Sequence, residues 1–166
     1  MVDIQIARTA GGNVPTYRWQ TDAGDDDIKA GDPVKLKAAG SPYVIGLADG
    51  DLTILTDTAM VGIAASASTH TASADGVVDV YIPMPGIVWK AKATTAANVD
   101  TAAEIAALVG DRVTLDLTGT TYTIDENAGD AATSAFVIVG GDPVTQELEF
   151  IIRSTATILG EAFDAA

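Results

Sequence analysis

VVDVYIPMPGIVWKA, residues 77–91, is the stretch that decides the fold class. Apolar and polar residues alternate over 77–82, which is typical of a half-buried β-strand. The Pro and Gly residues of 83–86 then predict a turn. The strand pattern resumes over 87–93, with Ile87, Trp89 and Ala91 on one face. The stretch therefore predicts two strands that contribute to a core centred on Trp89.

Short apolar runs between turn residues continue on both sides of this stretch. Gly31-Asp32-Pro33, for example, predicts a turn, and the strand after it carries Val34 and Leu36 on one face. Further strands are predicted over residues 4–8, 16–20, 34–37, 43–47, 59–64, 112–117, 121–124, 135–139 and 147–153. The fold class predicted from the sequence is therefore mainly β.

The spacing of apolar residues changes from that of a strand to that of a helix between residues 99 and 109. Thr101 can cap a helix, and Glu104 stands three residues later, as in a capping box. Ile105 and Leu108 then share one face, and Gly110 ends the helix. The C-terminal part is therefore predicted to be a smaller α+β lobe with one short helix.

Three regions follow from these patterns. Residues 1–21 are predicted to form an N-terminal arm, residues 22–93 a β-rich core domain, and residues 94–166 the α+β lobe. The alternative is one continuous domain, because 166 residues can bury a single core. Gly-Asp-Pro-Val occurs at 31–34 and at 141–144, and we interpret it as shared turn chemistry rather than a duplication.

The charge balance argues against a nucleic-acid partner. Nine Lys and Arg residues against 23 Asp and Glu residues give a net charge of −14, whereas affinity for phosphate backbones depends on basic side chains. The chain has no cysteine, which excludes disulfides and thiol chemistry. No apolar stretch reaches the roughly 20 residues of a membrane helix. We expect a soluble protein without a secretion signal or a membrane partner.

The sequence offers little for catalysis. Its one histidine, His70, lies in a loop of small residues with no nucleophile motif nearby. We expect it to be a solvated surface residue, and we predict that the protein is not an enzyme and has no catalytic residues.

Two acidic clusters could bind calcium through carboxylate oxygens. They lie at residues 22–27 and 125–130. Neither fits the EF-hand spacing, and we interpret both as solvated turns. The sequence therefore predicts no metal ligands and no cofactor, although calcium stays open as an alternative.

Apolar residues near the two termini have two interpretations. They are either edge strands of the chain's own core, or arms that pair with a neighbouring protein's sheet or fill its pockets. The N-terminal candidates for partner contact are Ile4, Ile6, Tyr17 and Trp19, and the C-terminal apolar residues are Ile158, Leu159 and Phe163.

The order of these features resembles the head decoration, or cement, proteins of tailed bacteriophages. The resemblance rests on the strand entry at 28–34, on Val61-Gly62-Ile63-Ala64 with the Ser/Thr/Ala loop that follows, and on 77–89 with its Pro-Met-Pro-Gly turn. It covers residues 28–153 and is one of pattern rather than of a signature motif.

The resemblance implies a β-barrel or β-tulip-like core, assembly as a homotrimer, and a terminal arm laid over the major capsid protein. Tyr81 and Trp89 are the candidates for the interface between copies. The location implied is the outer surface of the capsid in the virion, after synthesis in the host cytoplasm. The alternative is a surface-displayed β module that binds carbohydrate or calcium.

Overall fold

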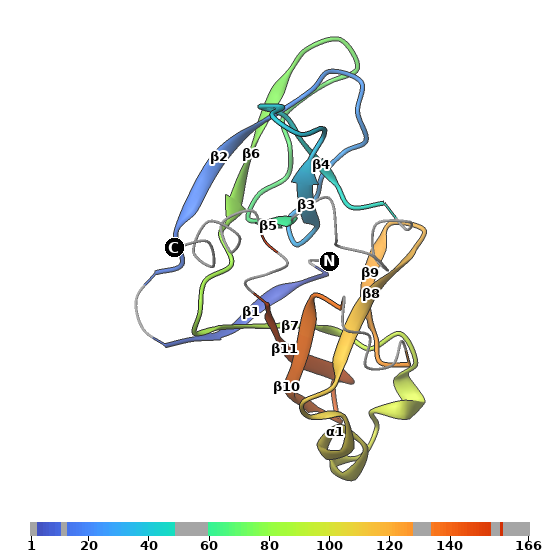
Figure 1. Cartoon of the computed structure of the whole chain (residues 1–166). Coiled ribbons are helices and arrows are strands. Elements are labelled where there is room, and N and C mark those ends of the chain that lie inside the picture. The colour runs from blue at the N-terminus through green and yellow to red at the C-terminus, as the bar shows by residue number, and fades with distance from the viewer. Residues whose placement is uncertain (1–2, 11–12, 49–59, 128–133, 154–156, 158–166) are drawn as a thin grey trace.

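The computed structural model describes residues 3–10, 13–48, 60–127, 134–153 and 157 (Figure 1). Within these ranges the chain forms two antiparallel β-sheets, one α-helix and one 3-10 helix. The two sheets occupy opposite halves of the molecule in Figure 1.

The larger sheet has six strands. Their spatial order is β1 (Gln5–Thr9), β7 (Ile87–Lys92), β11 (Glu147–Ile152), β10 (Phe136–Asp142), β8 (Arg112–Thr118) and β9 (Thr121–Asp125). The smaller sheet has five strands, in the order β2 (Thr16–Thr21), β6 (Gly76–Tyr81), β5 (Met60–Ala64), β3 (Pro33–Leu36) and β4 (Val44–Gly46).

The predicted central stretch forms β6 and β7, and its alternation matches their burial. Ile87, Trp89 and Ala91 are 6%, 1% and 2% exposed, whereas Val88 and Lys90 between them are half-buried. The segment between the strands does not fold back as a hairpin. β6 belongs to the five-stranded sheet and β7 to the six-stranded sheet, so residues 82–86 carry the chain from one sheet to the other.

The core consists of two clusters of buried side chains. The larger contains Trp89, Phe136 and Phe150 of the six-stranded sheet together with Met60 and Ile63 of β5. Phe136 and Phe150 meet edge to face with ring centroids 5.3 Å apart, a favourable aromatic geometry. The smaller cluster is formed by side chains of the five-stranded sheet and by one residue of the loop before β3: Val34, Val44, Val61, Ala64, Val78 and Val80, with Ile28. Because β5 contributes to both clusters, the two sheets share packing.

The mainly β class with one short helix is confirmed. The sheets are not closed into a barrel, however. Each sheet brings two strands that are not neighbours in its order close together, β2 with β4 and β7 with β9, but the pairing between them is an isolated bridge. These bridges join Gln20 to Tyr43 and Ala93 to Ile124. A single bridge at one end does not form the ladder that a closed barrel requires.

The three predicted regions are interleaved in the sheets. β1 and β2 come from residues 1–21, and each is an edge strand of a different sheet. β7, from the predicted core region, pairs with β11 of the C-terminal region, with Trp89 opposite Phe150. The six-stranded sheet therefore draws strands from all three regions.

The helix α1 (Ala102–Leu108) follows a 3-10 helix η2 (Ala96–Asn98). The predicted capping box is present: the Glu104 backbone N–H donates to the Thr101 side chain, and the Glu104 carboxylate accepts from the Thr101 backbone N–H. Ile105 is buried in the larger cluster, and Gly110 follows with a φ of +96° that suits glycine. In the described ranges, neither helix has the length and apolar character needed to cross a membrane.

Candidate functional site

The first two predicted contact residues pack against the chain's own core. Ile4 is 1% exposed and belongs to the larger cluster. Ile6, on β1, is partly buried against the same cluster and lies opposite Trp89. Little of the Ile4 side chain is therefore available to a partner in this structure.

Tyr17 and Trp19 share one face of β2, but their burial differs. Trp19 packs against the smaller cluster, and its indole Nε1 is buried without a hydrogen-bond partner among the described residues. Tyr17 is 59% exposed. On the opposite face Arg18 donates to Asp79 at 2.9 Å, which holds β2 on β6. Tyr17 is thus the most accessible of the four N-terminal candidates.

The two candidates for an interface between copies lie side by side. The rings of Tyr81 and Trp89 have centroids 6.2 Å apart. Trp89 is 1% exposed and is a core residue, whereas Tyr81 is half-buried. Only Tyr81 of this pair keeps appreciable exposed surface for contact with another copy.

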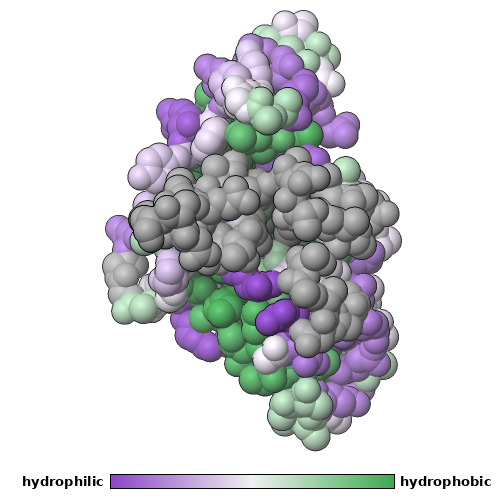
Figure 2. Space-filling model, in the orientation of Figure 1, coloured by the Kyte–Doolittle hydropathy of each residue, from purple (hydrophilic) through white to green (hydrophobic). Residues whose placement is uncertain are grey.

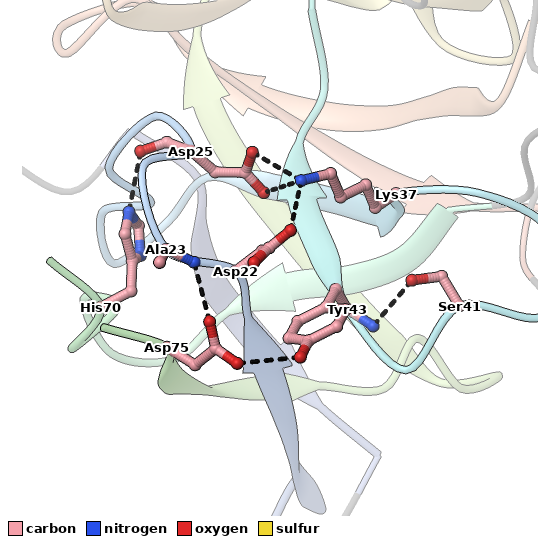
Figure 3. A network of polar contacts seen from close by, with 8 residues as sticks. All are labelled: Asp22, Ala23, Asp25, Lys37, Ser41, Tyr43, His70 and Asp75. Atoms are coloured by element: carbon pink, nitrogen blue, oxygen red, sulfur yellow. Dashed lines mark hydrogen bonds and ion pairs between the residues drawn. The ribbon is translucent and has the colours of Figure 1, made fainter. Parts of the chain in front are cut away.

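The acidic segment 22–27 forms a largely exposed turn in which two of the carboxylates pair with a lysine (Figure 3). Lys37 Nζ lies 2.7 Å from Asp22 Oδ2 and 2.8 Å from Asp25 Oδ1. The hydrogen bond from Lys37 lowers the pKa of Asp22, and the two aspartates in turn raise the pKa of Lys37. The lysine ammonium thus lies where a bound cation would have to contact these two carboxylates.

Asp75 links the same segment to the β3–β4 connection (Figure 3). Its carboxylate accepts a hydrogen bond from the Ala23 backbone N–H at 3.0 Å and from the Tyr43 hydroxyl at 2.8 Å. The bond to Asp75 and its negative charge raise the pKa of Tyr43. The network therefore joins three loops that are far apart in the sequence.

The prediction of a solvated His70 is wrong. His70 is 8% exposed, and its Nε2 lies 2.8 Å from the Asp25 backbone oxygen. Because a carbonyl oxygen only accepts, Nε2 must carry the proton. Nδ1 is buried without a hydrogen-bond partner among the described residues. His70 is therefore a structural side chain that anchors the acidic segment.

An open hollow of about 380 Å³ lies beside this histidine. Its lining comes from two loops: Gly24, Asp25, Asp26, Asp27, His70, Thr71 and Ala72. Asp25 is engaged by Lys37, and the Asp27 side chain is 87% exposed. The hollow is open to solvent and its lining contains no large apolar side chain, whereas most ligand pockets are enclosed by apolar walls.

In the second acidic cluster, hydrogen-bond donors surround the carboxylate of Glu126. Glu126 is 7% exposed, and its carboxylate accepts from the Thr95 backbone N–H and from the side chains of Asn98 and Asn127. By accepting from Thr95 before η2 and from Asn98 at its end, Glu126 stabilises this short helix. The remaining members of the predicted cluster, residues 128–130, lie outside the described residues, as do Ile158, Leu159 and Phe163.

No group of three or more His, Cys, Asp or Glu side chains in the described part of the chain could hold a metal ion. The role of Lys37 was missed because its partners lie 12 and 15 residues away. In the sequence, Lys37 is the last residue of the predicted strand 34–37 and follows Lys35 at strand spacing, which does not indicate a partner. Only the fold brings Lys37 to the acidic segment.

Comparisons of the chain with protein-family models, with curated proteins and with solved structures found no match.

Proposed function

We propose that this protein is a structural capsid decoration (cement) protein. It binds the outer surface of an assembled viral capsid and stabilises it, as the resemblance to phage head decoration proteins implies. Its partners are the major capsid protein and further copies of itself in a homotrimer. The role needs no catalysis and no cofactor.

The observation that supports this proposal most is the edge position of β2. It is an outer strand of the five-stranded sheet, and over residues 16–19 no described strand pairs with its side away from β6. An edge strand offers backbone N–H and C=O groups to a strand of another chain. Tyr17, 59% exposed, adds an aromatic side chain at the same edge.

The charge of the chain suits the same role. A net charge of −14 favours the outside of a particle over the nucleic-acid side. A protein that binds only the assembled lattice stabilises that lattice by mass action, so many weak and identical contacts suffice.

The proposal is tested by cosedimentation of the purified full chain with undecorated, expanded capsids of a candidate phage, together with its native mass by light scattering. We expect saturable binding by a trimer and a higher melting temperature of the decorated shell. A monomer that binds no shell would contradict the proposal and would favour the carbohydrate- or calcium-binding alternative.

A matched pair of variants tests the edge contact. Tyr17→Ala should keep the melting temperature and weaken capsid binding, because the side chain is exposed. Trp19→Ala should lower the melting temperature, because Trp19 packs against the smaller cluster. Full capsid binding by Tyr17→Ala would exclude the Tyr17 side chain from the contact.

A further inference from the structure

The hydrogen bonds of β6 show which of its residues face β2. Asp79 accepts from the Ala65 N–H at 2.7 Å, and its own N–H donates to the Ser66 hydroxyl at 3.1 Å. Both partners belong to the segment after β5, so the backbone groups of Asp79 point away from β2. In an antiparallel pair, residues that bond across to the neighbouring strand alternate with residues that do not. Val78 and Val80 therefore face β2.

The register then assigns the backbone groups of β2. Tyr17 and Trp19 lie opposite the two valines, so their N–H and C=O groups bond to β6. Thr16 and Arg18 alternate with them, and their backbone groups point to the open edge of the sheet. Outside the β2–β6 ladder, no described residue hydrogen-bonds to these groups. Each of the two residues thus offers one N–H and one C=O to a partner.

The chain closes other stretches of strand edge by itself. On β9, an outer strand of the six-stranded sheet, the Tyr122 N–H donates to Asp3 and the Ile124 carbonyl accepts a backbone N–H, both at 2.8 Å. β2 is closed at Gln20, which pairs with Tyr43 in a parallel bridge. An edge whose groups are paired is no template for another strand. The opening on β2 is therefore confined to the part before Gln20.

The side chains beside this opening leave recognition to the backbone. Arg18 donates to Asp79 through two hydrogen bonds of 2.9 and 3.2 Å, so both charges are already balanced. β2 lies along the outer margin of the molecule in Figure 1, and Figure 2 shows hydrophilic side chains over much of that half of the molecule. Tyr17, on the face opposite Arg18, is 59% exposed. An added strand can therefore place an apolar side chain beside Tyr17 while its backbone supplies the bonds.

We propose that a short extended segment of the major capsid protein adds to β2 as a new outer strand and bonds to the backbone of Thr16 and Arg18. This assignment rests on the proposed function and adds to it the chemistry of the contact, which is an extended segment recognised through its backbone rather than its charge. Because Gln20 is already paired, the added strand ends before Gln20 and uses at most the two N–H and two C=O groups of these residues.

The short contact fits the proposed assembly. Each hydrogen bond contributes only modestly to binding, so one copy holds weakly and many identical copies are needed. Pairing of β2 with β2 of another copy would close as a two-fold dimer, whereas the proposed assembly is a trimer. These points favour a capsid segment over a second copy as the added strand.

Proline at position 18 tests the assignment, because proline has no N–H and is tolerated in a strand only where that N–H faces out of the sheet. Arg18→Pro and Arg18→Ala both remove the pair with Asp79, but only Arg18→Pro also removes the outward N–H. In cosedimentation of the full chain with undecorated, expanded capsids, we expect Arg18→Pro to bind at least about tenfold more weakly than Arg18→Ala. Thr16→Pro and Thr16→Ala form a second pair with the same expectation.

The melting temperature of each variant reports its folding. Each proline variant should melt close to its alanine counterpart, whereas Tyr17→Pro, which removes an N–H of the β2–β6 ladder, should melt far lower. Unfolding of both Arg18→Pro and Thr16→Pro would contradict the outward direction of the two N–H groups and would overturn the assignment.

Capsid binding separates this assignment from the proposed function. Equal binding within both pairs of variants would overturn the assignment and leave the proposed function standing. No binding by the wild type would overturn both. A lower native mass of the proline variants than of the alanine variants, measured by light scattering, would give the edge to contacts between copies instead.

Discussion

Asp32 is a buried carboxylate in the turn before β3. It is 6% exposed, and its Oδ2 accepts the Lys29 backbone N–H at 2.8 Å. Burial raises the pKa of Asp32 from 3.8 to about 6, against the lowering effect of the bond from Lys29. The turn is therefore most stable when this carboxyl is protonated.

The consequence is a pH dependence that belongs to this one residue. Because the folded pKa lies above the unfolded value, the contribution is fully present below about pH 4 and is lost as pH rises through about 6. Asp32→Asn keeps an acceptor for Lys29 and removes the titration. We expect its gain over the wild type, by urea unfolding, to grow from near zero at pH 4 to at most about 3 kcal/mol at pH 7.5. A constant difference at both pH values would contradict this.

Gly62 tests the contact between β5 and β6. A Cβ at this position would lie 2.0 Å from the Tyr81 carbonyl oxygen and 2.8 Å from Val80 Cγ1. Since the nearest atom is backbone, the strand itself would have to shift. We expect Gly62→Ala to lower the unfolding free energy by more than about 3 kcal/mol.

The control is Gly119→Ala in the β8–β9 turn. Gly119 has a φ of +67°, and no described atom lies within 4 Å of an added Cβ. This change should lower the unfolding free energy by only about 1–2 kcal/mol, because it adds backbone strain without a steric clash. If chemical denaturation showed the same loss of unfolding free energy for both variants, the close approach of β5 and β6 would not account for the effect of Gly62→Ala.

At the level of elements, α1 depends on its first turn because seven residues are too few for a helix to be stable alone. Thr101→Ala removes the side-chain cap, and we expect a loss of about 1 kcal/mol in unfolding free energy. Thr120→Ala, at an exposed turn position, is the control. Equal stabilities of the two variants in thermal unfolding would mean that packing of Ile105 alone holds the helix.

Two identical tetrapeptides show how context decides an element. In Gly31-Asp32-Pro33-Val34 the Asp side chain accepts from Lys29, three residues earlier, and Gly31 has a φ of +94°. In Gly141-Asp142-Pro143-Val144 the Asp side chain accepts from Val144, two residues later. The first leads into β3, whose first two residues are Pro33 and Val34, whereas the second contains the last two residues of β10 and leads into the turn before β11. The shared sequence therefore encodes a preference for turns and not a repeated structure.

On the scale of the whole molecule, the two core clusters should unfold together. Met60 and Ile63 of β5 belong to the larger cluster, whereas Val61 and Ala64 of the same strand belong to the smaller one. Trp89 reports on the larger cluster and Trp19 on the smaller. In the single-tryptophan variants Trp19→Phe and Trp89→Phe, the remaining tryptophan's fluorescence should change at the same denaturant concentration as the far-UV circular dichroism. Separate transitions within either variant would show two independently folding units.

Much of the local structure was predictable from the sequence because it depends on neighbours in the chain. The alternation over 77–82 and 87–93 gave strands close to β6 and β7, and the spacing of Thr101, Glu104 and Gly110 gave α1. Periodicity and capping act over a few residues, so they can be read without knowing the fold.

Only the tertiary structure decided which elements meet. It placed β6 and β7 in different sheets, set Trp89 opposite Phe150 of β11, and brought Lys37 to Asp22. It also buried His70 against the Asp25 carbonyl, although the surrounding loop is polar. The physical reason is that hydrophobic burial has no direction and strand edges pair with any compatible strand. The local pattern fixes which face of a strand is apolar, whereas its partner depends on how the whole chain packs.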